Sequence, residues 1–131
     1  MRRKNQKENI LVEPGAYPEK HELRTAEVLV SKYDRVLFLK PVDLYNIKSA
    51  DILMNGLKWE IKSPKTRTLS GVEQILKRAT KQSQNIVLDS QRIKCLRDID
   101  LERYLHNKAA QQKTIKKLIF VNRKREIVDI K

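Results

Sequence analysis

Residues 49–63 read SADILMNGLKWEIKS, and two segments of alternating polarity in this stretch flank the dipeptide Asn55-Gly56. Asn-Gly between alternating segments is the strongest short-range hairpin signal, because a type I′ turn needs a positive φ at both central positions. We therefore predict two strands, 51–54 and 58–62, joined by a two-residue turn. The turn length also fixes which residues of the two strands face each other.

This pairing sorts the hairpin side chains onto two faces, since opposed residues share a face and side chains alternate along each strand. The face that carries Ile52 and Trp59 is apolar and is expected to join the core. The opposite face brings Asp51 directly across from Glu60, with Lys62 further along the same strand. Facing carboxylates repel each other, so the pair needs a compensating charge.

A divalent cation is the simplest compensation, because Mg²⁺ prefers oxygen ligands and typically takes one or two carboxylates with waters and a phosphate. A metal held by Asp51 and Glu60 would polarise a scissile phosphate and lower the pKa of a bound water. Lys62 would orient that water or stabilise charge that develops on the phosphorus centre. Spacing alone leaves one alternative open, a solvent-exposed face on which the lysines neutralise the acids.

Outward from the hairpin, hydrophobic periodicity predicts an α/β domain with a single mixed β-sheet flanked by helices. The expected order is α-β-β-β-α-β-α-β-β. Helices are expected over 19–32, 70–83 and 101–111, and the other strands over 36–42, 86–88, 117–122 and 126–130. Residues 1–15 are expected to form a basic N-terminal arm, and residues 16–131 the nuclease domain.

The charge balance limits the function classes. The chain of 131 residues has 29 Lys and Arg against 16 Asp and Glu, a formal charge of +13. Such an excess favours a polyanionic partner, because phosphate contacts by Lys and Arg release counterions. The apolar runs are too short to span a bilayer, and no segment has the form of a signal peptide. We therefore expect action in the cytoplasm.

Residues 49–63 resemble the core motif of the PD-(D/E)xK, or restriction-endonuclease-like, nucleases, and the likeness extends from about Pro18 to the C-terminus. Ala50 stands where these nucleases usually have a proline. More narrowly, the chain resembles the C-terminal toxin nuclease domains of contact-dependent inhibition systems, of the CdiA type, and their orphan relatives on mobile elements.

The resemblance implies a metal-dependent nuclease toxin that uses Mg²⁺ or Mn²⁺. It favours RNA, and tRNA in particular, as substrate, while DNA stays open. It also implies delivery into a target bacterium and a cognate immunity protein, which we expect to be acidic because it must mask a basic surface. The alternative from another class is a non-catalytic basic nucleic-acid-binding module, and the oligomeric state stays unknown.

The resemblance further implies an acid from the first helix, where Glu22 and Glu27 are the candidates. Relative to Ala26 on the apolar stripe, Glu22 lies about 40° away and Glu27 about 100° away. Glu22 is therefore expected to face the sheet as a metal ligand and to complete a catalytic set with the hairpin residues. An ordinary first-turn Glu favoured by the helix dipole is the alternative.

Other polar residues are weaker candidates for substrate contact. His21 neighbours Glu22, and the basic turn 123–125 is expected to be solvated. The weaker substrate-binding candidates, each of which has a solvated loop or helix face as its alternative, are Ser63, Lys65, Arg67, Gln74 and Arg78.

Overall fold

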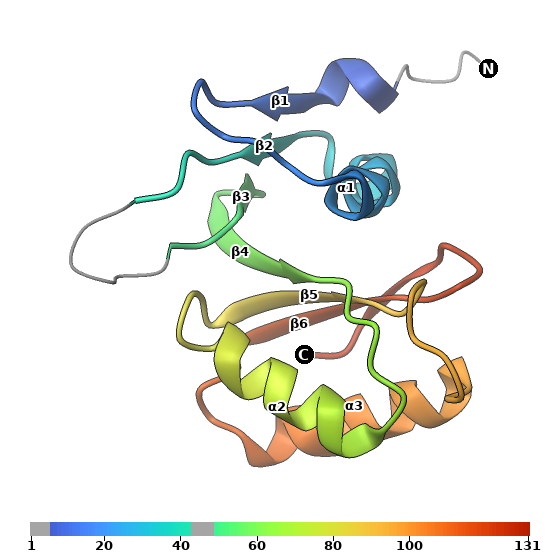
Figure 1. Ribbon diagram of the computed structural model, residues 1–131. Coiled ribbons are helices and arrows are strands. Elements are labelled where there is room, and N and C mark those ends of the chain that lie inside the picture. Colours follow the sequence, from blue (N-terminus) through green and yellow to red (C-terminus); the bar gives the residue numbers. More distant parts are fainter. Residues whose placement is uncertain (1–5, 43–48) are drawn as a thin grey trace.

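The hairpin lies in the middle of a sheet whose strands follow one another in chain order (Figure 1). The computed structural model describes residues 6–42 and 49–131. In these ranges the elements are η1 (Gln6–Asn9), β1 (Ile10–Val12), α1 (Lys20–Tyr33), β2 (Val36–Phe38), β3 (Ile52–Met54), β4 (Leu57–Lys62), α2 (Leu69–Ala79), β5 (Asn85–Asp89), α3 (Asp98–Gln111), β6 (Lys117–Val121) and β7 (Ile127–Asp129).

The sheet is mixed. β1 is parallel to β2, the pairs β2–β3 and β3–β4 are antiparallel, β4, β5 and β6 are parallel, and β7 is antiparallel to β6. The predicted mixed α/β fold is thus confirmed. Within the hairpin, Ile52 faces Trp59 and Met54 faces Leu57, which is the predicted register.

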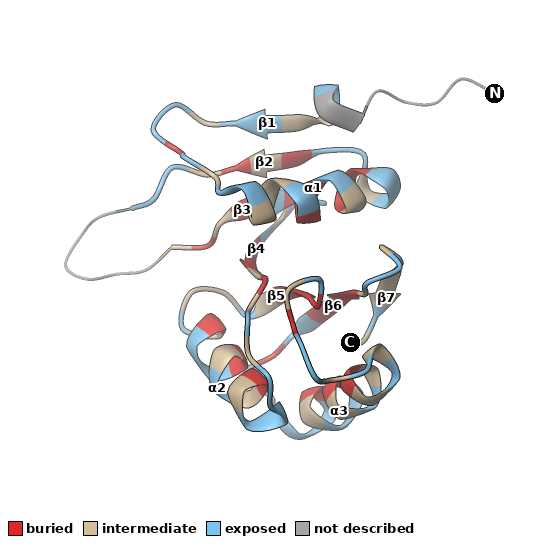
Figure 2. Ribbon diagram, turned by 45° about the vertical axis from the view of Figure 1, so that its right-hand side comes forward, coloured by how far each residue is buried: buried red, intermediate tan, exposed pale blue. Residues whose placement is uncertain are grey.

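Helices cover both faces of the sheet, with α1 on one side and α2 and α3 on the other (Figure 1). Buried side chains are concentrated where helices meet strands (Figure 2). The apolar face of the hairpin packs with α1, and Trp59 is 3% exposed and donates its indole N–H to the carbonyl oxygen of Met54. The α2 and α3 side forms a second core cluster around Leu76, Leu105 and Phe120. Among the described helices, none is long and apolar enough to cross a bilayer.

The expected boundaries differ from the structure at several places, and two of them lie in the N-terminal half of the sheet. β1 lies within the residues assigned to the N-terminal arm, and it pairs with β2, so the expected boundary at residue 15 does not coincide with the edge of the sheet. The strand expected over 36–42 ends at Phe38. β1 has only three residues, too few to show alternating polarity in the sequence. Its pairing partner β2 is distant in the chain, with α1 between them. Residues 1–5 of the predicted arm lie outside the described residues.

Candidate active site

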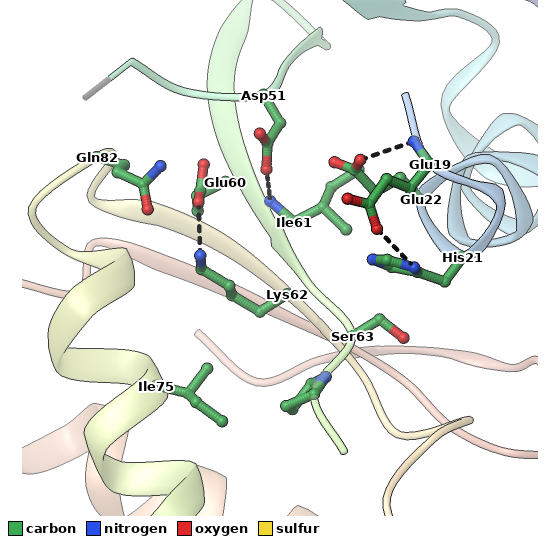
Figure 3. Close-up of a pocket in the computed structure, with 11 residues that line it drawn as sticks. Glu19, His21, Glu22, Asp51, Glu60, Ile61, Lys62, Ser63, Ile75 and Gln82 are labelled. Atoms are coloured by element: carbon green, nitrogen blue, oxygen red, sulfur yellow. Dashed lines mark hydrogen bonds and ion pairs between the residues drawn. The ribbon is translucent and has the colours of Figure 1, made fainter. Parts of the chain in front are cut away.

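All four predicted catalytic residues line one pocket of about 320 Å³, namely Glu22, Asp51, Glu60 and Lys62 (Figure 3). The pocket lies between the N-terminal end of α1, the second half of β4 and one side of α2. The residues that line it are Glu19, His21, Glu22, Asp51, Glu60, Ile61, Lys62, Ser63, Pro64, Ile75 and Gln82. The long-range packing of α1 against the hairpin face thus brings Glu22 to the acids of the hairpin.

Glu60 is the most deeply buried acid of the pocket, with 1% of its surface exposed. Its Oε2 lies 3.0 Å from Nζ of Lys62, while its Oε1 is buried without a hydrogen-bond partner. Burial and then the nearby Asp51 carboxyl raise the pKa of Glu60 from 4.5 to about 8, and Lys62 offsets only part of this effect. A buried carboxylate oxygen without a donor is costly, so its presence here needs an explanation.

Asp51 lies just before β3. The regular pairing of β3 with β4 ends at Ile52 and Trp59, so it does not include the predicted pair of Asp51 with Glu60. The backbone N–H of Asp51 donates to the carbonyl oxygen of Trp59 at 3.0 Å. Its side-chain Oδ2 accepts the N–H of Ile61 at 2.9 Å. The carboxylate therefore takes a place in the strand pairing and is held beside Glu60, although the two residues are not a regular cross-strand pair.

Glu22 faces the sheet side of α1, as the helix stripe predicts, and it also serves the helix start. Its Oε1 accepts the backbone N–H of Glu19 at 2.9 Å, which is one half of a capping box. Burial is the main cause that raises the pKa of Glu22, and Asp51 raises it further. His21 lies beside it, with Nδ1 3.3 Å from Oε2 of Glu19.

The weaker candidates divide between the pocket and the surface. Ser63 lines the pocket, is 8% exposed, and has a buried Oγ without a hydrogen-bond partner. The other four do not line the pocket, namely Lys65, Arg67, Gln74 and Arg78. α2 presents Ile75 to the pocket, and the segment after it contributes Gln82.

Two further features were missed or misjudged from the sequence. Glu19 lines the pocket, and its only sequence signature is the spacing of three residues to Glu22 that marks a capping box. The basic turn was expected to be solvated, and Arg123 and Lys124 are indeed exposed. The ion pairs of Arg123 with Asp98 and of Arg125 with Asp89, both at 2.8 Å, were not foreseen. Ion pairs between segments this far apart in the chain leave no periodic pattern in the sequence.

The donor chemistry of the pocket suits a hard divalent cation. In the residues that the structure describes, no three His, Cys, Asp or Glu side chains are already arranged around a metal position. Asp51 and Glu60 nevertheless offer adjacent carboxylates, and Oε1 of Glu60 is a buried acceptor without a hydrogen-bond donor. Two carboxylates with waters and a substrate phosphate are a usual Mg²⁺ environment, so these residues fit such an ion.

Comparisons with known proteins give a family and a fold. Residues 48–127, more than half of the chain, match the contact-dependent growth inhibition CdiA C-terminal domain. Across 93% of this chain and 98% of the other, the structure is similar to a solved "CdiA-CT/CdiI toxin and immunity complex from Burkholderia pseudomallei", with a TM-score of 0.67 and 16% sequence identity. At this identity the similarity shows a common fold. No curated protein matches the sequence significantly.

Proposed function

Since the chain belongs to the family of contact-dependent growth inhibition CdiA C-terminal domains, and is thus a toxin domain, we propose that it acts as a metal-dependent nuclease. The observation that carries this proposal is the buried carboxyl of Glu60. It has an unpartnered oxygen, a pKa raised to about 8, Asp51 beside it and Lys62 at 3.0 Å. Ordinary packing does not require such a costly group, whereas a cation-binding site does.

In this proposal Asp51 and Glu60 hold a Mg²⁺ or Mn²⁺ ion, and Glu22 lies close enough in the same pocket to contribute directly or through water. The ion supplies Lewis-acid chemistry at a scissile phosphate. Asp51 is held in position by the Ile61 N–H. Lys62, which is 30% exposed, has an ammonium that can reach both Glu60 and a phosphate at the pocket mouth. Its charge stabilises negative charge that develops there.

The hairpin with Asp51, Glu60 and Lys62 supports membership of the PD-(D/E)xK superfamily, and the charge of +13 supports a polyanionic substrate. We propose RNA, and tRNA in particular, as the substrate, with DNA as the alternative in the same class. The pocket residues are equally able to act on either phosphodiester. Only cleavage assays with both substrates decide between them.

Membership of this toxin family also suggests a partner protein. The similar fold from Burkholderia pseudomallei was solved as a toxin and immunity complex. We propose that this chain likewise has an immunity protein, that this protein is acidic because of the +13 charge of the toxin domain, and that the domain acts in the cytoplasm of a target cell after delivery.

The test is incubation of the purified chain with total RNA and with plasmid DNA, with Mg²⁺, with Mn²⁺ and with EDTA. We expect metal-dependent cleavage that Asp51→Asn and Glu60→Gln each reduce by at least about 10³-fold, since loss of a group that holds the ion removes several kcal/mol of transition-state stabilisation. Glu102→Gln on α3 is the control, because it makes the same charge change outside the pocket.

Full activity in EDTA would contradict the metal mechanism. Binding of nucleic acid without cleavage under any metal condition would favour the non-catalytic basic module. That module explains the charge of +13, but it gives no reason for the burial of Glu60.

A further inference from the structure

Asp89 is a buried acid outside the pocket and is completely enclosed, with 0% exposure. Arg125 holds it with two hydrogen bonds, Nη1 to Oδ1 at 2.8 Å and Nη2 to Oδ2 at 2.9 Å. The backbone N–H of Gln91 donates to Oδ1 at 2.8 Å. The hydroxyl of Thr25 on α1 donates to Oδ2 at 2.6 Å. Both carboxylate oxygens are therefore saturated by donors from three separate segments.

The connection to α1 has two points. Oγ1 of Thr25 also lies 3.1 Å from the carbonyl oxygen of His21, in the first turn of the helix. Nη2 of Arg125 reaches the carbonyl oxygen of Arg24 at 3.3 Å. A side chain and a backbone carbonyl of α1 are thus both linked to the end of β5, one turn after the residues of α1 that line the pocket.

The sheet end of this connection lies next to the catalytic strand. β5 is parallel to β4, and Leu88 pairs with Lys62, so Asp89 follows the residue that is in register with the pocket lysine. The side chain of Asp89 lies on the α1 side of the sheet, where it contacts Thr25. The hydrogen bonds of Asp89 therefore connect the end of β5, which lies next to the strand that carries Lys62, with the helix that carries Glu22.

We propose that Asp89, Thr25 and Arg125 are positioning residues that set the place and rotation of α1, so that Glu22 lies beside Asp51 and Glu60. This inference rests on the proposed function, because it assigns the network to the same metal-dependent site. Apolar packing alone tolerates small rotations of a helix, whereas directional hydrogen bonds to a saturated carboxylate select one rotation.

The energetics of a buried ion pair favour a positioning role over a purely stabilising one. Removing the Asp89 carboxylate and most of the Arg125 side chain from water is expensive, and well-packed apolar residues of similar volume often stabilise a fold as much or more. A buried pair can instead select one arrangement of its segments. Here the hydroxyl of Thr25 and the carbonyl of Arg24 connect the pair to α1, whose first turn lines the pocket.

Thr25 offers the sharpest test, because Thr25→Val keeps its shape and removes only the hydroxyl. Thr25→Ser restores the hydroxyl. Thr80→Val is the matched control, because Thr80 lies at the end of α2 and its hydroxyl donates to the carbonyl oxygen of Lys77, outside the network. Three quantities are measured for each protein: the thermal midpoint, kcat and KM for cleavage well below that midpoint, and Mn²⁺ affinity by calorimetry.

We expect Thr25→Val to lower Mn²⁺ affinity and kcat by about 10- to 100-fold, as supporting residues around metal ligands do, with KM little changed. Thr25→Ser should recover most of the loss, and Thr80→Val should match the wild type. A lower midpoint with unchanged kcat and Mn²⁺ affinity would overturn the positioning role and leave Thr25 purely structural.

Failure of the proposed function gives a different result. If the wild type cuts neither RNA nor DNA, Mn²⁺ affinity alone decides, and equal affinities in the wild type and Thr25→Val overturn the inference. If the wild type binds no Mn²⁺ either, the metal site and its positioning network are both refuted.

Discussion

At the scale of single residues, Glu60 is a buried acid whose surroundings oppose its ionisation. Burial is the main reason that its pKa is raised to about 8, and the Asp51 carboxyl adds to the effect. The salt bridge to Lys62 reduces the cost of ionisation and does not remove it. Ionisation of Glu60 is therefore unfavourable in the folded protein, and under the proposed function a bound cation would offset that cost.

This pKa leads to a prediction about stability without metal. Because the folded-state pKa of about 8 lies above the ordinary 4.5, the folded protein holds more protons than the unfolded chain between these pH values. The contribution of Glu60 to the free energy of unfolding should be greatest below pH 4.5. It should be lost as pH rises from there through 8. A fall on the order of a few kcal/mol is expected.

Urea unfolding in EDTA at several pH values measures this effect. Glu60→Gln, which cannot ionise, should flatten the fall and be more stable than the wild type near pH 8. Glu102→Gln should keep the wild-type profile. A wild-type profile that is flat between pH 5 and 8 would show that Glu60 is ionised in the folded state at ordinary pH.

At the scale of elements, the hairpin depends on its turn. Asn55 has φ 55° and Gly56 has φ 76°, so both central positions are left-handed, as the type I′ prediction requires. A Cβ added to Gly56 would meet nothing within 4 Å. The cost of a side chain there is thus conformational and involves no steric clash.

Gly56→Ala should therefore destabilise the protein by about 1–2 kcal/mol, the usual cost of a left-handed residue with a Cβ. Chemical denaturation measures the change. Asn55→Gly is the control and should alter stability by only a few tenths of a kcal/mol to about 1 kcal/mol, since glycine adopts this φ without strain. A neutral Gly56→Ala would mean that the turn adjusts to another type.

Local sequence predicted most elements because turns and amphipathic periods are short-range properties. The helices begin and end within four residues of their predicted positions: α2 ends at Ala79 and not at 83, and α3 begins at Asp98 and not at 101. The earlier start of α3 is explained by Asp98 and Asp100. These two acids belong to its first turn, where the helix dipole favours them. β1 was missed because its pairing with β2, which lies across α1, defines it more than its own residues do.

At the scale of the whole molecule, the excess of 29 Lys and Arg over 16 Asp and Glu dominates. Part of this charge is used internally, since Arg123 and Arg125 pair with buried or half-buried acids. Under the proposed function, the remaining charge is available to bind a polyanion. Binding to nucleic acid should then release counterions and weaken steeply with salt.

Fluorescence anisotropy with labelled RNA and the Glu60→Gln variant tests this without cleavage. Affinity should fall about 10³-fold or more between about 50 and 200 mM salt if six or more phosphates are contacted. An oligomer with an uncharged backbone is the control and should show little salt dependence. A flat profile for RNA itself would mean that the positive surface does not contact phosphates.

The sequence by itself determined the hairpin, its turn, the sorting of its two faces and the set of acids worth testing, because these depend on neighbours a few residues apart. Only the tertiary structure decided that α1 brings Glu22 to that hairpin, that burial raises the pKa of Glu60, and that Arg125 pairs with the buried Asp89. Those properties arise from desolvation and from contacts between segments far apart in the chain, and neither leaves a periodic trace in the sequence.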